Sequence, residues 1–358
     1  MKKILFNLIS GQIFPNYFLI KHIKPDKCVN FYTEETEYQN VIFKNVLTGL
    51  DIEEVEVTAF DFYNCYNVIK NYVEKYISNS LILNFTGGTK IMSSAAFCVF
   101  KEKKLAIKYL DSQNNKVISL ENGCQNEECF CMNISVEDYF KLTDQSIDYE
   151  TPNIKSEDNE DRVKFRRYME KNYPKIEALF IQLAVKSGSE KRKWRKEDHE
   201  LNVNNNKLIY TASNKKYEII TNDNEKFILY NDDAFYYITG GWMENLVYEK
   251  IKNSKVYYDI RSNFKVNWAQ KNTKNEFDIV ATKNHFLHIF EVKSGELNSD
   301  MILKLNSLNL LYGGLYSKSY VITYFDLGEK HKELLSRANE YKIKIIKLSD
   351  LENFLKNL

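Results

Sequence analysis

Residues 81–90 read Leu-Ile-Leu-Asn-Phe-Thr-Gly-Gly-Thr-Lys, and this stretch decides the fold of the N-terminal half. Its apolar residues predict a buried strand, its glycines a tight turn, and the residues that follow, 90–101, a helix. The same alternation continues on both sides, with strands expected at 4–9, 28–32, 54–59 and 105–110 and helices at 17–23, 37–47 and 65–77. Such alternation predicts a mostly parallel sheet covered on both faces, which is an α/β fold.

The glycine turn is also a candidate ligand site. Glycines let the backbone approach a ligand, a helix N-terminus offers free N–H groups, and Lys90 adds positive charge, so the turn suits an anion such as phosphate. A structural role, with Thr89 capping the helix, has equal support. Ligands of open α/β sheets bind beyond the carboxyl ends of the strands, so we expect Ser10, Gln12 and Thr33 near the same crevice. The glycine spacing fits neither a Walker A loop nor a dinucleotide-binding motif.

Two runs in the C-terminal half predict a hairpin. Asn275–Ala281 and Phe286–Ser294 are rich in β-branched and aromatic residues, and residues 282–285 between them predict the turn. Around this hairpin we expect an α+β arrangement with a central sheet. Its other elements are a helix reaching Ile251, helices at 300–312 and 330–341, and strands at 319–323 and 343–346.

The register of the hairpin decides which side chains meet. Alternation along the strand puts Glu291 and Lys293 on one face. If Ala281 pairs with Phe286, Asp278 lies on the same face, diagonal to Glu291. Two carboxylates and an ammonium on one sheet surface are what a metal-dependent nuclease needs. Another register would put Glu276 in place of Asp278.

The composition of the chain and the spacing of its cysteines limit the possible domain number, metal sites and location. The length of 358 residues suggests two domains, and 50 Lys+Arg against 49 Asp+Glu leave no bulk charge to attract a nucleic acid. Cys124, Cys129 and Cys131 form the one cysteine cluster; we favour buried positions of a strand at 129–134 over a zinc site. The apolar start is broken by Asn7 and lacks a cleavage site, so we expect a cytoplasmic protein with no membrane span.

The two halves are joined by a segment of different composition. Residues 144–161 are polar and acidic and contain Pro152, which predicts a linker. We therefore expect domains at 1–145 and 162–358, a linker at 146–161, and a core of the second domain at 235–358. Before that core, residues 162–185 predict a helix, and residues 186–226 are charged and read as irregular.

The motifs of both halves resemble known families. The string Asn84-Phe-Thr-Gly-Gly-Thr-Lys-Ile-Met92, with Ser10-x-Gln12 and Asn16, resembles the signature of CARF domains, the Rossmann-like sensors of CRISPR systems. The second half resembles restriction-endonuclease-like domains with a PD-(D/E)xK pattern, entered through Tyr237-Ile-Thr-Gly-Gly-Trp242. Phe277 departs from the proline of that pattern, and Asn306 stands where glutamine is expected two residues after Lys304.

This resemblance implies a CARF-nuclease effector of type III CRISPR immunity. Such a protein is a homodimer that cyclic tetra-adenylate switches on, cutting single-stranded DNA and RNA and nicking duplex DNA. The two-fold symmetry of the ring would match an isologous dimer. The resemblance implies a cyclic oligoadenylate site made of Ser10, Gln12, Thr33, Asn84, Thr86, Gly87, Gly88, Thr89 and Lys90.

The resemblance also implies roles in the nuclease site. Asp278 and Glu291 would bind Mg²⁺ or Mn²⁺ through carboxylate oxygens, with the backbone carbonyl of Val292 as a third ligand. Glu244 flanks the apolar stripe of its helix and could be a further ligand. Lys293 would orient the attacking water and offset charge on the phosphate; acting as a base would require burial to lower its pKa.

Other interpretations remain open at this point. The chain could be a CARF sensor whose second domain only binds DNA, or a CARF protein that also degrades its activator. The basic segment Lys191–Lys196, which includes Trp194, could contact a phosphate backbone or be a solvated loop. Arg192 and His199 match the loose spacing of HEPN ribonucleases, which we consider the weaker interpretation.

Overall fold

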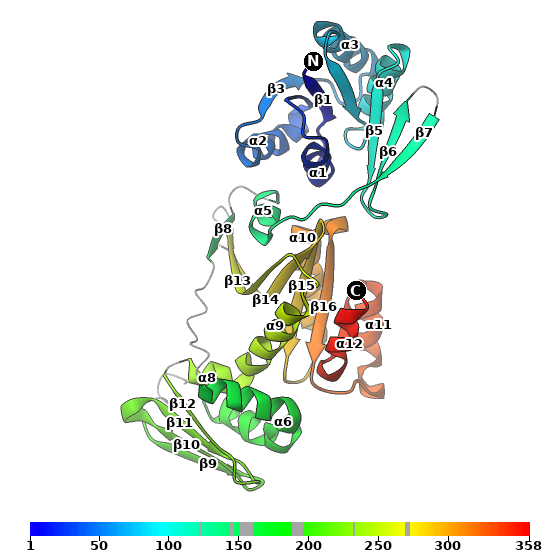
Figure 1. Ribbon diagram of the computed structural model, residues 1–358. Coiled ribbons are helices and arrows are strands. Elements are labelled where there is room, and N and C mark those ends of the chain that lie inside the picture. Colours follow the sequence, from blue (N-terminus) through cyan, green and yellow to red (C-terminus); the bar gives the residue numbers. More distant parts are fainter. Residues whose placement is uncertain (122–123, 144–146, 151–159, 188–195, 232, 269–272) are drawn as a thin grey trace. The chain divides into compact units, whose positions relative to one another are not determined.

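The computed structural model describes residues 1–121, 124–143, 147–150, 160–187, 196–231, 233–268 and 273–358. The chain divides into two compact units, Met1–Ile147 and Asp148–Leu358, which are described separately (Figure 1). Most of the predicted linker and most of the basic segment Lys191–Lys196, Arg192 included, lie outside these residues. Within the described residues no helix is both long enough and apolar enough to cross a bilayer.

The first unit is built on one sheet, which in the described chain has seven strands in the order β3-β2-β1-β4-β5-β6-β7. Five strands run parallel, and β6 and β7 add antiparallel pairs at one edge. Their bounds are β1 Lys3–Leu8, β2 Lys27–Tyr32, β3 Asp51–Glu56, β4 Ser80–Asn84, β5 Ala106–Asp111, β6 Lys116–Glu121 and β7 Cys124–Cys129. The predicted α/β fold is confirmed.

Helices cover both faces of this sheet. Ile4, Phe6 and Leu8 of β1 join one apolar cluster with residues of α3 and α4, so by alternation Leu5 and Asn7 face the other side. There α1 packs on β1 and α2 on β2. The helices span α1 Phe14–Ile23, α2 Glu37–Val46, α3 Phe62–Tyr76, α4 Lys90–Glu102 and α5 Val136–Lys141.

Two expectations for this unit were wrong. β3 begins at Asp51, three residues before the predicted strand at 54–59. The prediction was placed too late because the buried alternation of Val55, Val57 and Ala59 continues past the end of β3. The strand predicted at 129–134 is absent among the described residues there. Instead β7 ends at Cys129, and Cys124, Cys129 and Cys131 are all exposed rather than buried.

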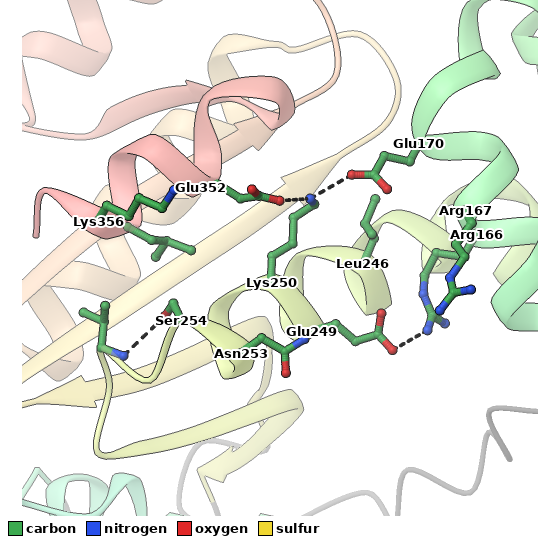
Figure 2. Close-up of a pocket in the computed structure, with 12 residues that line it drawn as sticks. Arg166, Arg167, Glu170, Leu246, Glu249, Lys250, Asn253, Ser254, Glu352 and Lys356 are labelled. Carbon is green, nitrogen blue, oxygen red and sulfur yellow. Dashed lines mark hydrogen bonds and ion pairs between the residues drawn. The ribbon is translucent and has the colours of Figure 1, made fainter.

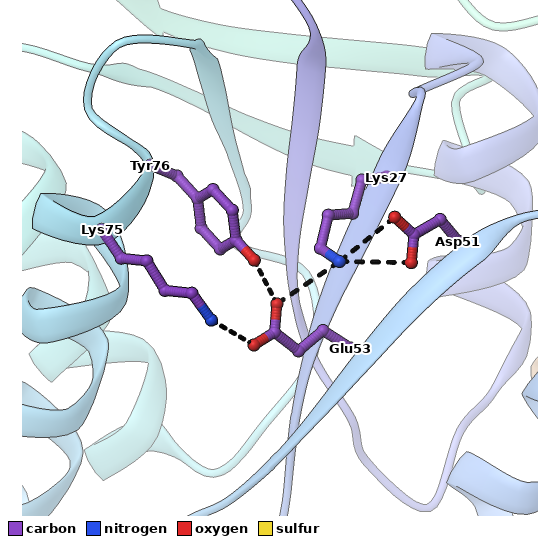
Figure 3. Close-up of polar contacts among 5 residues, drawn as sticks. All are labelled: Lys27, Asp51, Glu53, Lys75 and Tyr76. Atoms are coloured by element: carbon purple, nitrogen blue, oxygen red, sulfur yellow. Dashed lines mark hydrogen bonds and ion pairs between the residues drawn. The ribbon is translucent and has the colours of Figure 1, made fainter.

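An ionic network joins the amino ends of β2 and β3 to the end of α3 (Figure 3). The Lys27 ammonium lies 3.2 Å from Asp51 and 3.4 Å from Glu53, and Lys75 pairs with Glu53 at 2.6 Å. The Tyr76 hydroxyl also donates to Glu53. The glycine turn follows the carboxyl end of β4, whereas this network lies at the amino ends of the parallel strands. There it links β2 and β3 to α3.

The second unit contains an antiparallel sheet that was not predicted. In the part of the chain that the structure describes it has four strands, with α6 (Glu160–Ser187) packed against it. The strands are β9 His199–Val203, β10 Asn206–Thr211, β11 Lys216–Ile220 and β12 Lys226–Tyr230. Leu208, Tyr217 and Leu229, each from a different strand, fill the core beneath α6. The expectation of irregular structure at 186–226 was wrong because the many charged residues of that segment obscured its short apolar stretches.

The core of the second unit is a mixed sheet whose order is β17-β16-β15-β14-β13-β8 among the described strands. Its strands are β8 Ile147–Glu150, β13 Asp259–Trp268, β14 Thr273–Lys283, β15 Phe286–Lys293, β16 Ser317–Thr323 and β17 Lys344–Lys347. Its helices are α8 Ala234–Tyr236, α9 Trp242–Ser254, α10 Ser299–Tyr312, α11 Lys332–Glu340 and α12 Leu351–Lys356. The predicted α+β arrangement is confirmed, but β13 was missed, and β8 is a strand where a linker was expected.

Candidate nuclease and ligand sites

The hairpin of β14 and β15 sets the register of the candidate nuclease site. Lys283 pairs with Phe286 and Ile279 with Phe290, so the loop is only the two residues 284–285. Asn284 adopts the left-handed conformation (φ 54°) that such a tight turn needs. The expected pairing of Ala281 with Phe286 was wrong by two residues, and because a shift of two keeps every side chain on its face, the site survives.

Asp278 and Glu291 meet one position beyond the last paired residues. The backbone N–H of Val292 donates a 2.7 Å hydrogen bond to Oδ2 of Asp278. The Lys293 ammonium lies 3.0 Å from Oε1 of Glu291, whose side chain is 6% exposed, against 40% for Lys293. The three predicted catalytic side chains therefore gather where the middle of β14 meets the carboxyl end of β15. Glu276 is exposed and lies 3.9 Å from Lys265 instead.

Mutual repulsion shapes the ionisation of this cluster. Burial, together with the charges of Glu291 and Glu244, raises the pKa of Asp278 to about 7. Burial is also the main reason that the pKa of Glu244 is raised. Burial acts to lower the pKa of Lys293, but the neighbouring carboxylates outweigh it and the pKa is raised. Lys293 therefore stays an ammonium, which suits charge stabilisation and not the role of a base.

Glu244 comes from the first turn of α9 and joins the cluster from a helix. The hydroxyl of Tyr236 donates a hydrogen bond to its Oε2. Nothing in the sequence singles Tyr236 out, because this contact depends on a π-helical turn, Tyr237–Gly241, that has no recognisable sequence pattern. Lys304, which also flanks an apolar stripe in the sequence, lies on α10 and is exposed.

The donor chemistry of the cluster fits a divalent cation. Carboxylate oxygens and a backbone carbonyl are the ligands that Mg²⁺ and Mn²⁺ prefer. A cation would also offset both the burial and the neighbouring carboxylate charges that raise the pKa of Asp278. Within the described residues no three His, Cys, Asp or Glu side chains already stand as a metal site. Each carboxylate is instead held by a protein donor: Val292 N–H, Lys293 or Tyr236.

The other face of α9 is anchored away from this site (Figure 2). The Lys250 ammonium lies between Glu170 of α6 and Glu352 of α12, at 2.7 and 2.5 Å. Arg166 of α6, almost fully buried, pairs with Glu249. These pairs line a cavity of about 520 Å³ that contains none of the candidate catalytic residues. They fix α9, and with it Glu244, against the rest of the unit.

In the first unit, the predicted ligand residues follow three neighbouring strands. Ser10 and Gln12 come after β1, Thr33 after β2, and the glycine turn after β4, which pairs with β1. Thr89 caps α4 by accepting a 3.2 Å hydrogen bond from the N–H of Met92, while Lys90 is exposed at the start of that helix. The capping role is therefore confirmed, and Lys90 stands beside the helix N-terminus that the sequence offered as an anion site.

The side chain of Asn84 supports the glycine turn by a hydrogen bond. Asn84 is fully buried, and its Oδ1 accepts a 3.1 Å hydrogen bond from the N–H of Thr86, so its side chain supports the turn and does not face a ligand. A Cβ on Gly87 would lie 2.2 Å from the carbonyl oxygen of Leu8, and Gly88 has a φ of +79°. Both positions therefore require glycine.

Asn84 belongs to a chain of buried amides on the α1 and α2 side of the sheet. Asn84 donates to Asn7 (3.1 Å), Asn7 to Asn30 (3.0 Å), Asn30 to Asn40 (3.0 Å), and Asn40 to the Glu54 carboxylate (2.6 Å). All four asparagines are fully buried. The chain runs from β4 across β1 and β2 to α2 and β3, so the support of the glycine turn extends over four strands.

Both parts of the chain match models of known domain families. Residues 4–139 match the model of the Card1 CARF domain, and residues 231–358 match that of the Card1-like endonuclease domain. Residues 140–230 lie outside both matches. No curated protein is significantly similar in sequence.

Three solved structures resemble the fold of this chain. Can2 from Sulfobacillus thermosulfidooxidans, in complex with cyclic tetra-adenylate, has a TM-score of 0.76 at 21% identity, covering 99% of this chain and 98% of that one. Protein VC1899 from Vibrio cholerae has a TM-score of 0.79 at 17% identity, covering 99% and 96%. A type III CRISPR defence DNA nuclease activated by cyclic oligoadenylate has a TM-score of 0.57 at 13% identity. The match covers 90% of this chain and 45% of that one.

Proposed function

Since the chain joins a Card1 CARF domain to a Card1-like endonuclease domain, we propose that it is a metal-dependent nuclease that a cyclic oligoadenylate switches on. The observation that supports the proposal is the convergence of Asp278, from the middle of β14, with Glu291 and Lys293 at the carboxyl end of β15. A CARF regulator without catalysis would have no need to hold two crowded carboxylates beside an ammonium, at the cost of their repulsion.

In this proposal the residues of the cluster divide the work. Asp278, Glu291 and the Val292 carbonyl hold Mg²⁺ or Mn²⁺, with Glu244 as a further ligand. When bound, the cation supplies electrophilic assistance to the phosphate and lowers the pKa of bound water. Lys293, kept charged by its neighbours, stabilises the negative charge that grows on the attacked phosphate.

The activator would bind at the carboxyl ends of β1, β2 and β4. The turn Thr86–Gly88, the N-terminus of α4 and the exposed Lys90 offer N–H groups and positive charge to a ring phosphate. Cyclic tetra-adenylate is the proposed ring, in line with the ligand of the Can2 structure. Its two-fold symmetry suits a homodimer, and it would activate only by binding the competent state more tightly.

The substrates proposed are single-stranded DNA and RNA, together with duplex DNA that is nicked. A plasmid relaxation assay with Mn²⁺, with and without cyclic tetra-adenylate, tests the proposal. Wild-type protein should relax the plasmid only when both are present, and Lys293→Ala should not. If wild type leaves the plasmid intact, or if Lys293→Ala cuts as fast as wild type, the chain is better described as a non-catalytic sensor. Incubating Lys293→Ala with the ring alone shows whether the CARF domain also degrades its activator.

A further inference from the structure

Tyr236 and Glu244 touch although eight residues separate them. The Tyr236 hydroxyl donates a hydrogen bond to Oε2 of Glu244. In an uninterrupted α-helix, residues eight apart lie roughly 12 Å apart along the axis, since each residue rises about 1.5 Å. Helical side chains also lean towards the N-terminus, so the tyrosine would point away from the glutamate. The contact therefore requires a local departure from α-helix.

That departure is the π-helical turn Tyr237–Gly241. Gly240 has an extended φ of 177°, which breaks the helix just before α9. Gly241 lets the Tyr236 ring pack against the backbone, since a Cβ there would lie 2.7 and 2.9 Å from two ring carbons. The turn and the glycine together fold the tyrosine over the start of α9. Single π-turns inside helices occur frequently at functional sites.

The hydroxyl lies within the electrostatic reach of two carboxylates of the cluster, Glu244 and Asp278. Burial raises the pKa of Tyr236, and Glu244, Asp278 and Glu276 add to the effect. The hydrogen bond itself makes the hydroxyl the donor and the carboxylate oxygen the acceptor. It engages one oxygen of Glu244 and leaves the other for a second partner, while the residue as a whole stays 51% exposed at the rim of the site.

We propose that Tyr236 is a positioning residue of the nuclease site, whose hydroxyl holds one oxygen of the Glu244 carboxylate and leaves the other available to a divalent cation. This inference rests on the proposed function, because Glu244 has no metal to serve in a protein without nuclease chemistry. Holding the carboxylate in place removes side-chain freedom that cation binding would otherwise have to restrict. Such second-layer partners of metal ligands typically change metal affinity or activity by about 10–100-fold.

The test is Tyr236→Phe in the full-length protein, which removes one hydroxyl and keeps the ring against Gly241. Mn²⁺ binding, measured by electron paramagnetic resonance titration of free Mn²⁺, should weaken by about 10–100-fold, and the metal-free melting temperature should stay unchanged. Tyr258→Phe, at an exposed tyrosine of the same unit, is the matched control. Unchanged or tighter Mn²⁺ binding by Tyr236→Phe would overturn the inference.

A double mutant separates positioning through Glu244 from a general structural effect. If Tyr236 acts through Glu244, then Tyr236→Phe combined with Glu244→Gln should bind Mn²⁺ no more weakly than Glu244→Gln alone. Additive losses would contradict the inference. A failure of the proposed function would give a different result, because the wild-type protein would then neither bind Mn²⁺ nor cut nucleic acid with the activator present. Wild type that binds and cuts, beside an unaffected Tyr236→Phe, refutes only the role of Tyr236.

Discussion

The N–H of Val292 donates its 2.7 Å hydrogen bond to the side chain of Asp278. The backbone pairing of β14 with β15 ends one residue earlier, at Ile279 and Phe290, so the Asp278 carboxylate bonds to β15 just beyond the last backbone pair. Asp278 is thereby fixed to the strand that carries Glu291 and Lys293. One of its oxygens is committed to the protein, and this bond helps to set the position of Asp278 in the site.

The crowding of carboxylates predicts a trade-off between stability and activity at Asp278. Its pKa of about 7 in the folded protein exceeds the ordinary aspartate value, so ionisation is disfavoured by folding. The cost is absent below about pH 4 and grows as pH rises towards 7. Asp278→Asn should therefore abolish cleavage yet raise the metal-free melting temperature at pH 8 by roughly 2–4 °C, with no gain at pH 4.

Thermal melts in a chelator at both pH values check this prediction. The exposed Asp300 of the same unit, changed to asparagine, is the control and should show no pH-dependent gain. A loss of stability at pH 8 in Asp278→Asn would mean that the carboxylate is stabilising.

Lys293→Met should separate metal binding from chemistry. Removing the ammonium leaves Glu291 without its 3.0 Å partner, so Mn²⁺ should bind as tightly as in wild type or more tightly. The single-turnover cleavage rate should fall by about 10²–10³-fold, since transition-state charge is no longer offset. Isothermal titration calorimetry and quenched-flow cleavage measure the two quantities. Weaker Mn²⁺ binding would instead make Lys293 a structural support of the site.

Gly87→Ala should damage the activator site through backbone displacement. The new Cβ would lie 2.2 Å from the Leu8 carbonyl, so either β1 or the turn must move. We expect cyclic tetra-adenylate binding to weaken by at least about tenfold, because misplaced N–H groups lose their hydrogen bonds. Fluorescence titration with labelled ring tests this. Gly328→Ala, where nothing lies within 4 Å of the new Cβ, should bind like wild type.

Asn30→Leu should destabilise the first unit more than its size change suggests. It removes the acceptor of Asn7 and the donor to Asn40, and both amides stay buried. Each unsatisfied group costs about 1–3 kcal/mol, which urea unfolding would detect. The exposed Asn339→Leu on α11 is the control. A similar small change in both variants would show that water or rearranged partners replace the lost bonds.

The sequence by itself determined the two fold classes and the face on which the candidate catalytic residues lie. Alternation of apolar residues fixes which side of a strand is buried, and a strand keeps its faces when the register slips by two. Asp278, Glu291 and Lys293 could therefore be grouped correctly from a hairpin with the wrong pairing. The tight turn at Gly87 and Gly88 could also be predicted from the sequence, because few other residues can occupy such a turn.

Only the tertiary structure decided what surrounds those residues. The fully buried Asn84 turned out to support the turn, since its partners Asn7 and Asn16 come from distant segments. The raised pKa of Lys293 depends on carboxylates from three elements. The contact of Tyr236 with Glu244 depends on a π-helical turn. Local pattern encodes burial and direction, whereas hydrogen-bond partners and electric fields arise from residues that only folding brings together.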